Sequence, residues 1–297
     1  MMLVSYRHKT SPGGWRAGVV LGERLFPVPG EGSAGLGVRE LLEQGRAALE
    51  GAFARARQHH DEEMDLLALD GLELGPPVPD PDKILCLGLN YREHAAEAGL
   101  PLPSVPVFFA KFRNSLTGPT DPVLLPATST QIDYEGELAV VIGTRCKDAS
   151  EEEALGYVAG YTVMNDVSAR DLQMQTSQWI AGKALDTFAP MGPGLVPAWE
   201  VPDPQRLTLT TRVNGQVVQH AQTADMVFTV AQAVAFLSSL MTLEPGDIIA
   251  TGTPSGVGFT RTPPLFLTDG DVTEVEIEGI GTIRNPVERR PAREAHR

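Results

Sequence analysis

The feature that most constrains the fold is a long succession of short strand-like runs between residues 83 and 287. These runs are rich in β-branched and aromatic residues, and they are broken by Gly, Pro, Asn and Asp, which favour turns. The pair Asn214-Gly215 lies between β-forming residues and is a strong signal for a tight hairpin. One long helical segment, at 229–240, interrupts the series. The sequence therefore predicts a β-rich mixed α/β domain rather than a regular βαβ alternation.

The first 75 residues have a different pattern. Strand-like pieces at 2–6 and 17–21 are followed by a helical run at 38–58 that is rich in Leu, Ala, Glu and Arg. The stretch Pro76–Lys83 contains four prolines in eight residues, which is typical of an extended connection. We therefore expect four parts: a small N-terminal α+β domain at 1–75, a Pro-rich linker at 76–83, a catalytic domain at 84–287 and a disordered tail at 288–297.

Composition excludes several classes of protein. A formal net charge of −14 disfavours binding to nucleic acid or to an anionic membrane surface. Two cysteines without CxxC spacing provide neither a disulfide framework nor a zinc site. The N-terminus lacks the apolar stretch of a signal peptide, and the most apolar segment, 226–243, is interrupted by polar residues and is short for a membrane span. These features predict a soluble, cytoplasmic protein.

The stretch QIDYEGELAVV at 131–141 carries three acidic residues spaced by two: Asp133, Glu135 and Glu137. On one strand these side chains would share a face and repel one another. One interpretation is a solvated polar face. The other is a divalent cation such as Mg²⁺, because carboxylate oxygens suit hard cations and two or three of them leave coordination positions for water and substrate.

A further carboxylate is available in the segment NDVSARD at 165–171. Asp166 follows an apolar strand-like run, and Asp171 is the alternative. Asn-Asp at the end of a strand is equally consistent with simple turn chemistry.

The segment LGLNYREHAAEAG at 87–99 reads as a strand end followed by a short helix. Asn90 and Glu93 have the spacing of a capping box, so Asn90 is the expected N-cap. His94 and Glu97 are three apart and share a helical face. A histidine beside a carboxylate is a candidate general base, although the pair is also compatible with an ordinary surface contact.

Two more segments complete the candidate site. Lys183 follows a glycine, but the P-loop spacing is absent, so it is either a solvated lysine or a group that binds an acidic substrate. The Gly-rich stretch ATGTPSGVG at 250–258 has neither GxGxxG nor GxSxG spacing. Its N–H groups and Thr253 could line an anion site, and a plain tight turn is the alternative.

Taken together, these segments resemble the fumarylacetoacetate hydrolase family. The resemblance covers roughly residues 80–287 and rests on the order and wording of KILCLGLNYREHAAE, DYEGELAVVIG, NDVSARDLQ, GKALDTFAPMGP, VNGQVVQ, GDIIATGTPSGVG and LTDGDVTEVEIEGIGTIRNPV. It implies mixed β-sheets rolled into a sandwich-like barrel with few helices, assembled as a homodimer. It also implies a bound Mg²⁺, with Mn²⁺ or Ca²⁺ as alternatives.

Matched residue by residue, the resemblance implies metal ligands Glu135, Glu137 and Asp166, catalytic residues His94, Glu97 and Lys183, and substrate-binding residues Arg170, Gln173 and Thr253. Asp133 is not assigned as a ligand. Lys111 matches a lysine common in the family, but Phe112 replaces the proline that often follows it, so the role of Lys111 stays open.

The function that follows is a metal-dependent enzyme acting on small 2-oxo, diketo or 2-hydroxy-dienoic acids through an enolate. The first expectation is C–C bond hydrolysis of an acylpyruvate or fumarylacetoacetate-type substrate. One alternative is a 2-hydroxyhepta-2,4-diene-1,7-dioate isomerase or decarboxylase of aromatic catabolism. Others are an oxaloacetate decarboxylase or tautomerase, and a catalytically silent binding module. The fold alone does not choose among these reactions.

Overall fold

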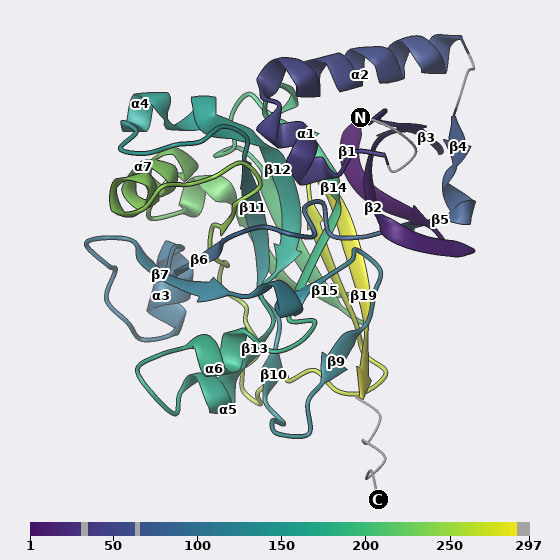
Figure 1. Ribbon diagram of the computed structural model, residues 1–297. Helices are drawn as coiled ribbons and strands as arrows, with labels where there is room; N and C mark the ends of the chain where they lie inside the picture. The colour runs from purple at the N-terminus through teal and green to yellow at the C-terminus, as the bar shows by residue number, and fades with distance from the viewer. Residues whose placement is uncertain (31–34, 63–65, 290–297) are drawn as a thin grey trace, which may run out of the picture.

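The computed structural model describes residues 1–30, 35–62 and 66–289, and it is built around one large mixed sheet (Figure 1). Its strands lie in the order β4-β3-β2-β1-β14-β12-β11-β17-β6-β7, with β5 beside β1 and β8 beside β14. Their bounds are β1 Met2–His8, β2 Ser11–Leu21, β3 Arg24–Pro27, β4 Leu67–Ala68, β5 Leu72–Leu74, β6 Ile84–Gly88, β7 Val107–Lys111, β8 Leu116–Thr117, β11 Gly136–Ile142, β12 Val158–Asn165, β14 Ala189–Pro197 and β17 Ile248–Ala250.

Two smaller sheets complete the strands. The five-stranded sheet has the order β16-β15-β18-β19-β9, and β10 pairs with β13. Their bounds are β9 Val123–Leu125, β10 Ile132–Asp133, β13 Ser168–Ala169, β15 Thr208–Val213, β16 Gln216–Gln222, β18 Val272–Ile277 and β19 Gly281–Arg289. The predicted hairpin is present between β15 and β16, where Asn214 and Gly215 both have positive φ, as a type I′ turn requires.

Apart from α2 and α7, the described helices have six residues or fewer, and most helices lie around the sheets. Their bounds are α1 Val38–Glu43, α2 Arg46–Asp61, α3 Arg92–Glu97, α4 Glu151–Ala154, α5 Arg170–Gln173, α6 Ile180–Lys183 and α7 Val230–Leu240. The predicted helix at 229–240 is confirmed: Thr229 is its N-cap, and the Thr229 hydroxyl accepts a hydrogen bond from the Gln232 N–H.

Central strands β11 and β12 are buried along their whole length. Alternate side chains of a strand point to opposite faces. Leu138 and Val140 therefore pack into a core shared with α7 and the five-stranded sheet, whereas Ala139 and Val141 pack into a core shared with α1 and α2. With apolar cores on both faces, β11 and β12 form a rigid base for the residues at their ends.

The structure differs from the sequence-based expectations at three places. The helical run at 38–58 is two helices, because the chain turns at Gly45 with φ +88°. QIDYEGELAVV is not one strand, since it leaves β10 after Asp133 and enters β11 at Gly136. Asn90 is not the N-cap of α3; Tyr91 takes that position, and the Asn90 amide group donates to the carbonyls of Thr251 and Phe228 instead.

The strand-rich fold with few helices agrees with the family resemblance, but within the described residues the sheets are not closed into a barrel, and β4 and β7 end the large sheet. Strand β1 joins this sheet through β14, so whether residues 1–75 fold as a separate domain stays a prediction. The predicted disordered tail began at residue 288, but residues 288 and 289 belong to β19; residues 290–297 lie outside the described residues. No helix in the described part of the chain is long and apolar enough to cross a membrane.

Candidate active site

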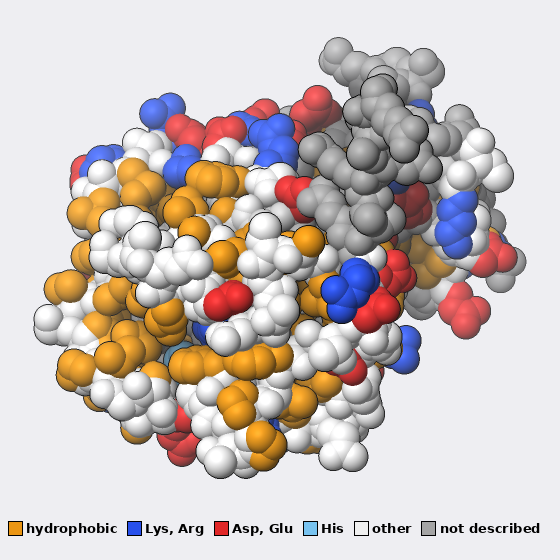
Figure 2. Space-filling model, turned by 90° about the horizontal axis from the view of Figure 1, so that it is seen from below, with side chains coloured by type: hydrophobic (Ala, Val, Ile, Leu, Met, Phe, Trp, Pro, Cys, Tyr) orange, Lys and Arg blue, Asp and Glu red, His pale blue; other side chains and the backbone are white. Residues whose placement is uncertain are grey.

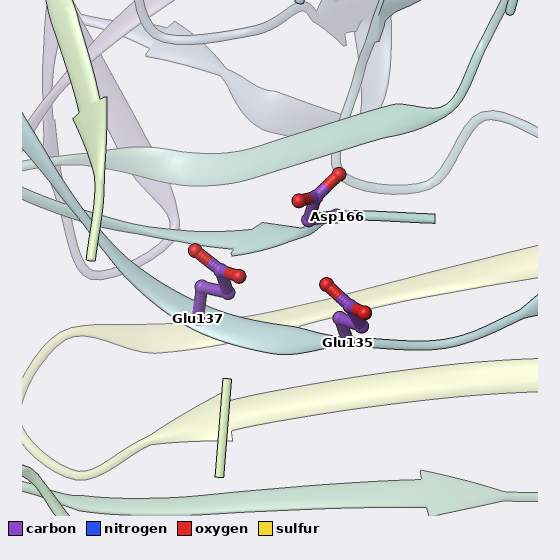
Figure 3. A group of neighbouring side chains, drawn as sticks. All are labelled: Glu135, Glu137 and Asp166. Atoms are coloured by element: carbon purple, nitrogen blue, oxygen red, sulfur yellow. The ribbon is translucent and has the colours of Figure 1, made fainter. Parts of the chain in front are cut away.

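Three carboxylates converge where β11 begins and β12 ends. Glu135 precedes β11, Glu137 is its second residue, and Asp166 directly follows β12. Antiparallel pairing of Gly136 with Asn165 brings these ends together, and the Asp166 N–H donates to the Glu135 carbonyl at 2.8 Å. Oxygens of the three buried carboxylates lie within 4.8 Å of one another (Figure 3). The structure thus brings together the three residues that the sequence suggested as metal ligands.

Glu137 is the carboxylate of this triad whose negative charge is least neutralised by neighbouring cations. Lys183 Nζ donates to Glu135 Oε2 at 2.6 Å and to Asp166 Oδ2 at 2.9 Å. Glu137 accepts its hydrogen bond from the Gly252 N–H at 2.8 Å. Burial raises the pKa of Glu137 well above its usual value, and the charges of Asp166 and Glu135 raise it further. The three carboxylates offer only oxygen ligands, and the charge of Glu137 is not paired with a cation among the described residues. Both features fit a hard divalent cation.

Lys111 lies behind the triad at the end of β7. Its ammonium group is fully buried and donates to Asp166 Oδ1 and to the Val167 carbonyl, the latter at 3.1 Å. Lys183 lines the cavity in front of the triad, whereas Lys111 is not among the lining residues. The role of Lys111 stayed open in the sequence analysis because Phe112 replaces the proline that often follows this lysine in the family.

Asp133 does not belong to the triad, although the sequence placed it on the same strand face. It is fully buried, and its two oxygens accept from the N–H groups of Tyr134, Gly258 and Phe259 and from Arg170 Nε. The break between β10 and β11 is what separates Asp133 from Glu135 and Glu137.

The alternative third ligand, Asp171, also lies apart from the triad. Its Oδ1 accepts hydrogen bonds from the Ser129 hydroxyl and from the Leu172 N–H. These contacts are those of a residue that stabilises the start of α5. Asp166, not Asp171, is therefore the residue that completes the carboxylate group.

The histidine–glutamate pair lies on α3. His94 is buried, and its Nδ1 is 3.6 Å from Glu97 Oε2, which is an ion-pair distance rather than a direct hydrogen bond. Both Glu97 carboxylate oxygens accept from the Gly256 N–H at 3.1 Å. Burial tends to raise the pKa of Glu97, but His94 and the Gly256 N–H outweigh it and lower the pKa. A charged carboxylate is thus held against the imidazole.

The N–H groups of the Gly-rich loop at 250–258 donate to carboxylate side chains of the protein itself. The N–H groups of Gly252, Gly256 and Gly258 donate to Glu137, Glu97 and Asp133. A loop of successive N–H donors stabilises negative charge in this way. The same loop therefore contacts the triad, the α3 pair and the buried Asp133.

A small cavity of about 60 Å³ lies between these groups. Its polar lining comes from six residues, all of which the sequence singled out: His94, Glu135, Arg170, Gln173, Lys183 and Thr253. The apolar lining was missed, because its members come from distant segments: Leu87, Leu89, Ala98, Leu100, Phe109, Met174, Trp179 and Phe259. Leu100 and Met174 are also exposed, and apolar side chains gather on the lower face of the molecule (Figure 2). The cavity thus has a charged floor and an apolar rim.

Two of the predicted substrate-binding residues have part of their hydrogen-bonding capacity in use. Gln173 Oε1 accepts from Arg170 Nη1 at 3.0 Å. The Thr253 hydroxyl donates to the Gly136 carbonyl at 3.0 Å and accepts from Gln219 Nε2 at 2.8 Å. Among the described residues, no hydrogen bond uses the Gln173 amide N–H groups.

Comparison with known proteins gives a consistent assignment. Residues 83–288 match the family model described as "Fumarylacetoacetate (FAA) hydrolase C-terminal". A mitochondrial oxaloacetate tautomerase of Xenopus laevis is 45% identical over 252 residues, covering 84% of this chain and 78% of that protein.

Solved structures agree with the fold along almost the whole chain. A fumarylacetoacetate hydrolase from Exiguobacterium antarcticum has a TM-score of 0.82 and 37% identity, covering 98% of this chain and 100% of that chain. A maleylpyruvate hydrolase from Sphingobium, solved with manganese(II) and pyruvate, has a TM-score of 0.78 and 31% identity, covering 97% and 99%. The chain described here therefore belongs to the fumarylacetoacetate hydrolase family of enzymes.

Proposed function

We propose that this enzyme interconverts the keto and enol forms of oxaloacetate or a very similar small 2-oxo acid, with a divalent cation, Mg²⁺ or Mn²⁺, as cofactor. The observation that carries the proposal is that His94 lines the same small cavity as Lys183 and the triad residue Glu135. The similarity to a protein named oxaloacetate tautomerase supports this reaction over the hydrolysis that we first expected from the sequence.

The residues suit a proton transfer at the carbon next to a carbonyl group. A divalent cation held by Glu135, Glu137 and Asp166 would supply positive charge that polarises the 2-oxo group. His94 takes the proton from the adjacent carbon, and the Glu97 carboxylate at 3.6 Å stabilises the imidazolium that forms. A proton returned to the carbonyl oxygen gives the enol, so no atoms are gained or lost.

Lys183 is the residue suited to the developing oxyanion. Its ammonium group is buried, lines the cavity and lies 5.0 Å from the centre of the Phe109 ring. Positive charge in a site with little water stabilises an oxyanion more strongly than it would in solution. The small cavity favours an acid of few atoms over a long acyl substrate.

C–C bond hydrolysis is the second candidate. The likeness to structures described as a fumarylacetoacetate hydrolase and a maleylpyruvate hydrolase favours it. In that reaction His94 would activate water, and the same oxyanion would leave with the cleaved fragment. The two reactions use the same groups and differ in whether a water molecule is consumed.

Product analysis separates these reactions. Purified protein would be incubated with oxaloacetate, acetylpyruvate or fumarylpyruvate, with Mn²⁺ or with EDTA, and followed by ultraviolet absorbance and mass spectrometry. We expect EDTA-sensitive loss of the oxaloacetate enol band without CO₂ or a change in mass. Two acids from an acylpyruvate would instead establish hydrolysis, and CO₂ with pyruvate would establish decarboxylation.

Replacing His94 by Ala tests the assigned base. We expect kcat to fall by about 10²- to 10⁴-fold, because a positioned base contributes this much to proton transfer. Mn²⁺ affinity should change little, since His94 is not one of the three carboxylates. His220→Ala is the matched control, because His220 lies on β16 and is exposed. Full turnover by His94→Ala would exclude His94 as the base.

We also infer a homodimer, which rests on the family resemblance alone. Sedimentation velocity of the full chain measures this directly. A single species at the monomer mass, at the concentrations used for the assays, would refute it.

A further inference from the structure

The triad is flanked by a second arrangement of buried charges, centred on Asp133 and Arg170. Arg170 is the first residue of α5, and only 4% of its surface is exposed. Its Nε donates to Asp133 Oδ2 at 2.8 Å, and its Nη1 lies 2.6 Å from Glu135 Oε1. The guanidinium carbon lies 4.4 Å from the centre of the Phe259 ring. One guanidinium thus connects Asp133 to a carboxylate of the triad.

The third nitrogen of this guanidinium has no partner. Arg170 Nη2 is buried and makes no hydrogen bond to any of the described residues, although Arg170 lines the cavity. A buried, charged donor without an acceptor is costly. Because Arg170 lines the cavity, we take an anionic oxygen of a ligand as the acceptor that Nη2 lacks, for which the carboxylate of a 2-oxo acid is suited.

Asp133 is itself fixed by the backbone around it. Gly258 and Phe259 donate their N–H groups to its two oxygens at 2.7 and 3.1 Å, and Tyr134 donates at 2.8 Å. At Gly258 a β-carbon would lie 1.9 Å from the Leu265 carbonyl oxygen, so a side chain is excluded there. The loop therefore sets the orientation of the Asp133 carboxylate, which in turn sets the direction of Arg170 Nε.

We propose that Asp133 is a positioning residue that holds Arg170 with Nη2 free for the substrate carboxylate. Arginine pairs with carboxylates most strongly when two nitrogens bind one carboxylate. Glu135 already pairs with Nη1 at 2.6 Å, and a bidentate pairing that also took up Nη2 would remove the free donor. The contact between Nε and Asp133 opposes that rotation. The proposal rests on the proposed function, because it assumes an anionic 2-oxo acid in the cavity.

The first test is Asp133→Asn in the full chain loaded with Mn²⁺, with the dissociation constant of pyruvate measured by calorimetry. Asn has nearly the shape of Asp, but its NH₂ group must face either Arg170 Nε–H or a backbone N–H. We expect the Kd for pyruvate to rise about 10- to 100-fold, as for loss of a hydrogen bond to a charged group. The Kd for Mn²⁺ should stay within about threefold, because all three triad carboxylates remain. An unchanged pyruvate Kd would overturn the proposal.

A double-variant cycle distinguishes positioning from a merely structural role. If Asp133 acts through Arg170, adding Asp133→Asn to Arg170→Gln should cause no further loss of pyruvate affinity. Additive losses would overturn the proposal, because they would mean that Asp133 acts through the loop alone. Asp171→Asn is the matched control, because Asp171 directly follows Arg170 but contacts Ser129. The pyruvate Kd of this variant should stay within about twofold of that of the unmodified protein.

If the Asp133→Asn variant does not fold, the Arg170→Lys variant provides a second test. A lysine has one charged nitrogen, which cannot both pair with Asp133 and face the cavity. Pyruvate affinity should then fall as far as in Arg170→Gln, and its retention would contradict the proposal. Absence of pyruvate binding by the unmodified protein would instead refute the proposed function, and this inference with it.

Discussion

Ion pairs in two regions of the molecule have nearly the same lengths but different surroundings. Around the triad, Lys183 lies 2.6 Å from Glu135, with side-chain exposures of 2% and 7%. On α2, Arg46 lies 2.7 Å from Glu50, with exposures of 65% and 50%. Exposed pairs contribute about 0–1 kcal/mol, whereas breaking a buried pair costs about 3–5 kcal/mol. The distance between two charged groups therefore says little about how much an ion pair contributes to stability, because that contribution depends on burial.

The buried and the exposed ion pairs also differ in what they indicate about function. In the buried group, four carboxylates face three cations: Asp133, Glu135, Glu137 and Asp166 against Lys111, Arg170 and Lys183. Such a group costs free energy to bury and is weak evidence of stability by itself. Perturbed carboxylates beside a cavity are instead typical of a functional site. The pairs of the N-terminal region, such as Arg46–Glu50, involve partly exposed side chains and carry no such implication.

The largest effect is expected for Glu135→Gln. This change removes the charge of one triad carboxylate, which is one of the two carboxylates paired with Lys183 and one of the two paired with Arg170. Loss of a group that only orients a metal ligand costs about 10- to 100-fold in metal affinity, so loss of a ligand should exceed about 100-fold. Calorimetric titration with Mn²⁺ measures this, and activity should fall in parallel. Full activity with unchanged metal content would exclude Glu135 as a ligand.

Lys111→Met should mainly affect stability. It leaves the Asp166 carboxylate without the cation behind it while both positions stay buried. We expect a loss of about 3–5 kcal/mol in the free energy of unfolding, measured by urea denaturation of the metal-free protein. Arg57→Met is the matched control in the exposed region, since Arg57 and Glu200 are 60% and 41% exposed. Equal losses in the two variants would mean that burial does not separate the two classes.

The sequence predicted the residues of the site better than the long-range contacts that hold them in place. Glu135, Glu137 and Asp166 were recognisable as candidates because they flank apolar strands, and the family resemblance selected them from a group that also contained Asp133 and Asp171. Asp133 was expected on one continuous strand with Glu135 and Glu137, but β10 ends at Asp133 and β11 begins at Gly136, and no glycine or proline at Tyr134-Glu135 signals this break. Contacts between distant segments are set by tertiary packing, and a local pattern does not encode them. For the same reason Asn90 was read as a helix cap, although its partners are more than 130 residues away.

A pH dependence should distinguish Glu97, which is partly buried, from an exposed glutamate. Burial tends to raise the pKa of Glu97, but the neighbouring His94 and the hydrogen bond from the Gly256 N–H lower it below its ordinary value. A carboxylate with a lowered pKa adds stability above its ordinary value of 4.5, and this contribution is lost as the pH falls through the folded-state pKa. The stability difference between the unmodified protein and Glu97→Gln should therefore shrink between about pH 6 and pH 3. Urea denaturation over this range checks it, with Glu23→Gln, exposed in the β2–β3 turn, as control. A constant difference would contradict the assignment.

The smallest effect is expected for Arg46→Gln at the start of α2, where two small terms oppose each other. Loss of the Arg46–Glu50 pair costs about 0.2–0.5 kcal/mol. However, Arg46 is the first residue of α2, where a positive charge opposes the helix dipole, and removing it returns about 0.3–1 kcal/mol. The free energy of unfolding should thus change by between about −0.2 and +0.8 kcal/mol. A loss above about 1 kcal/mol would show that an exposed pair here matters as a buried one does, and the contrast between the two regions would fail.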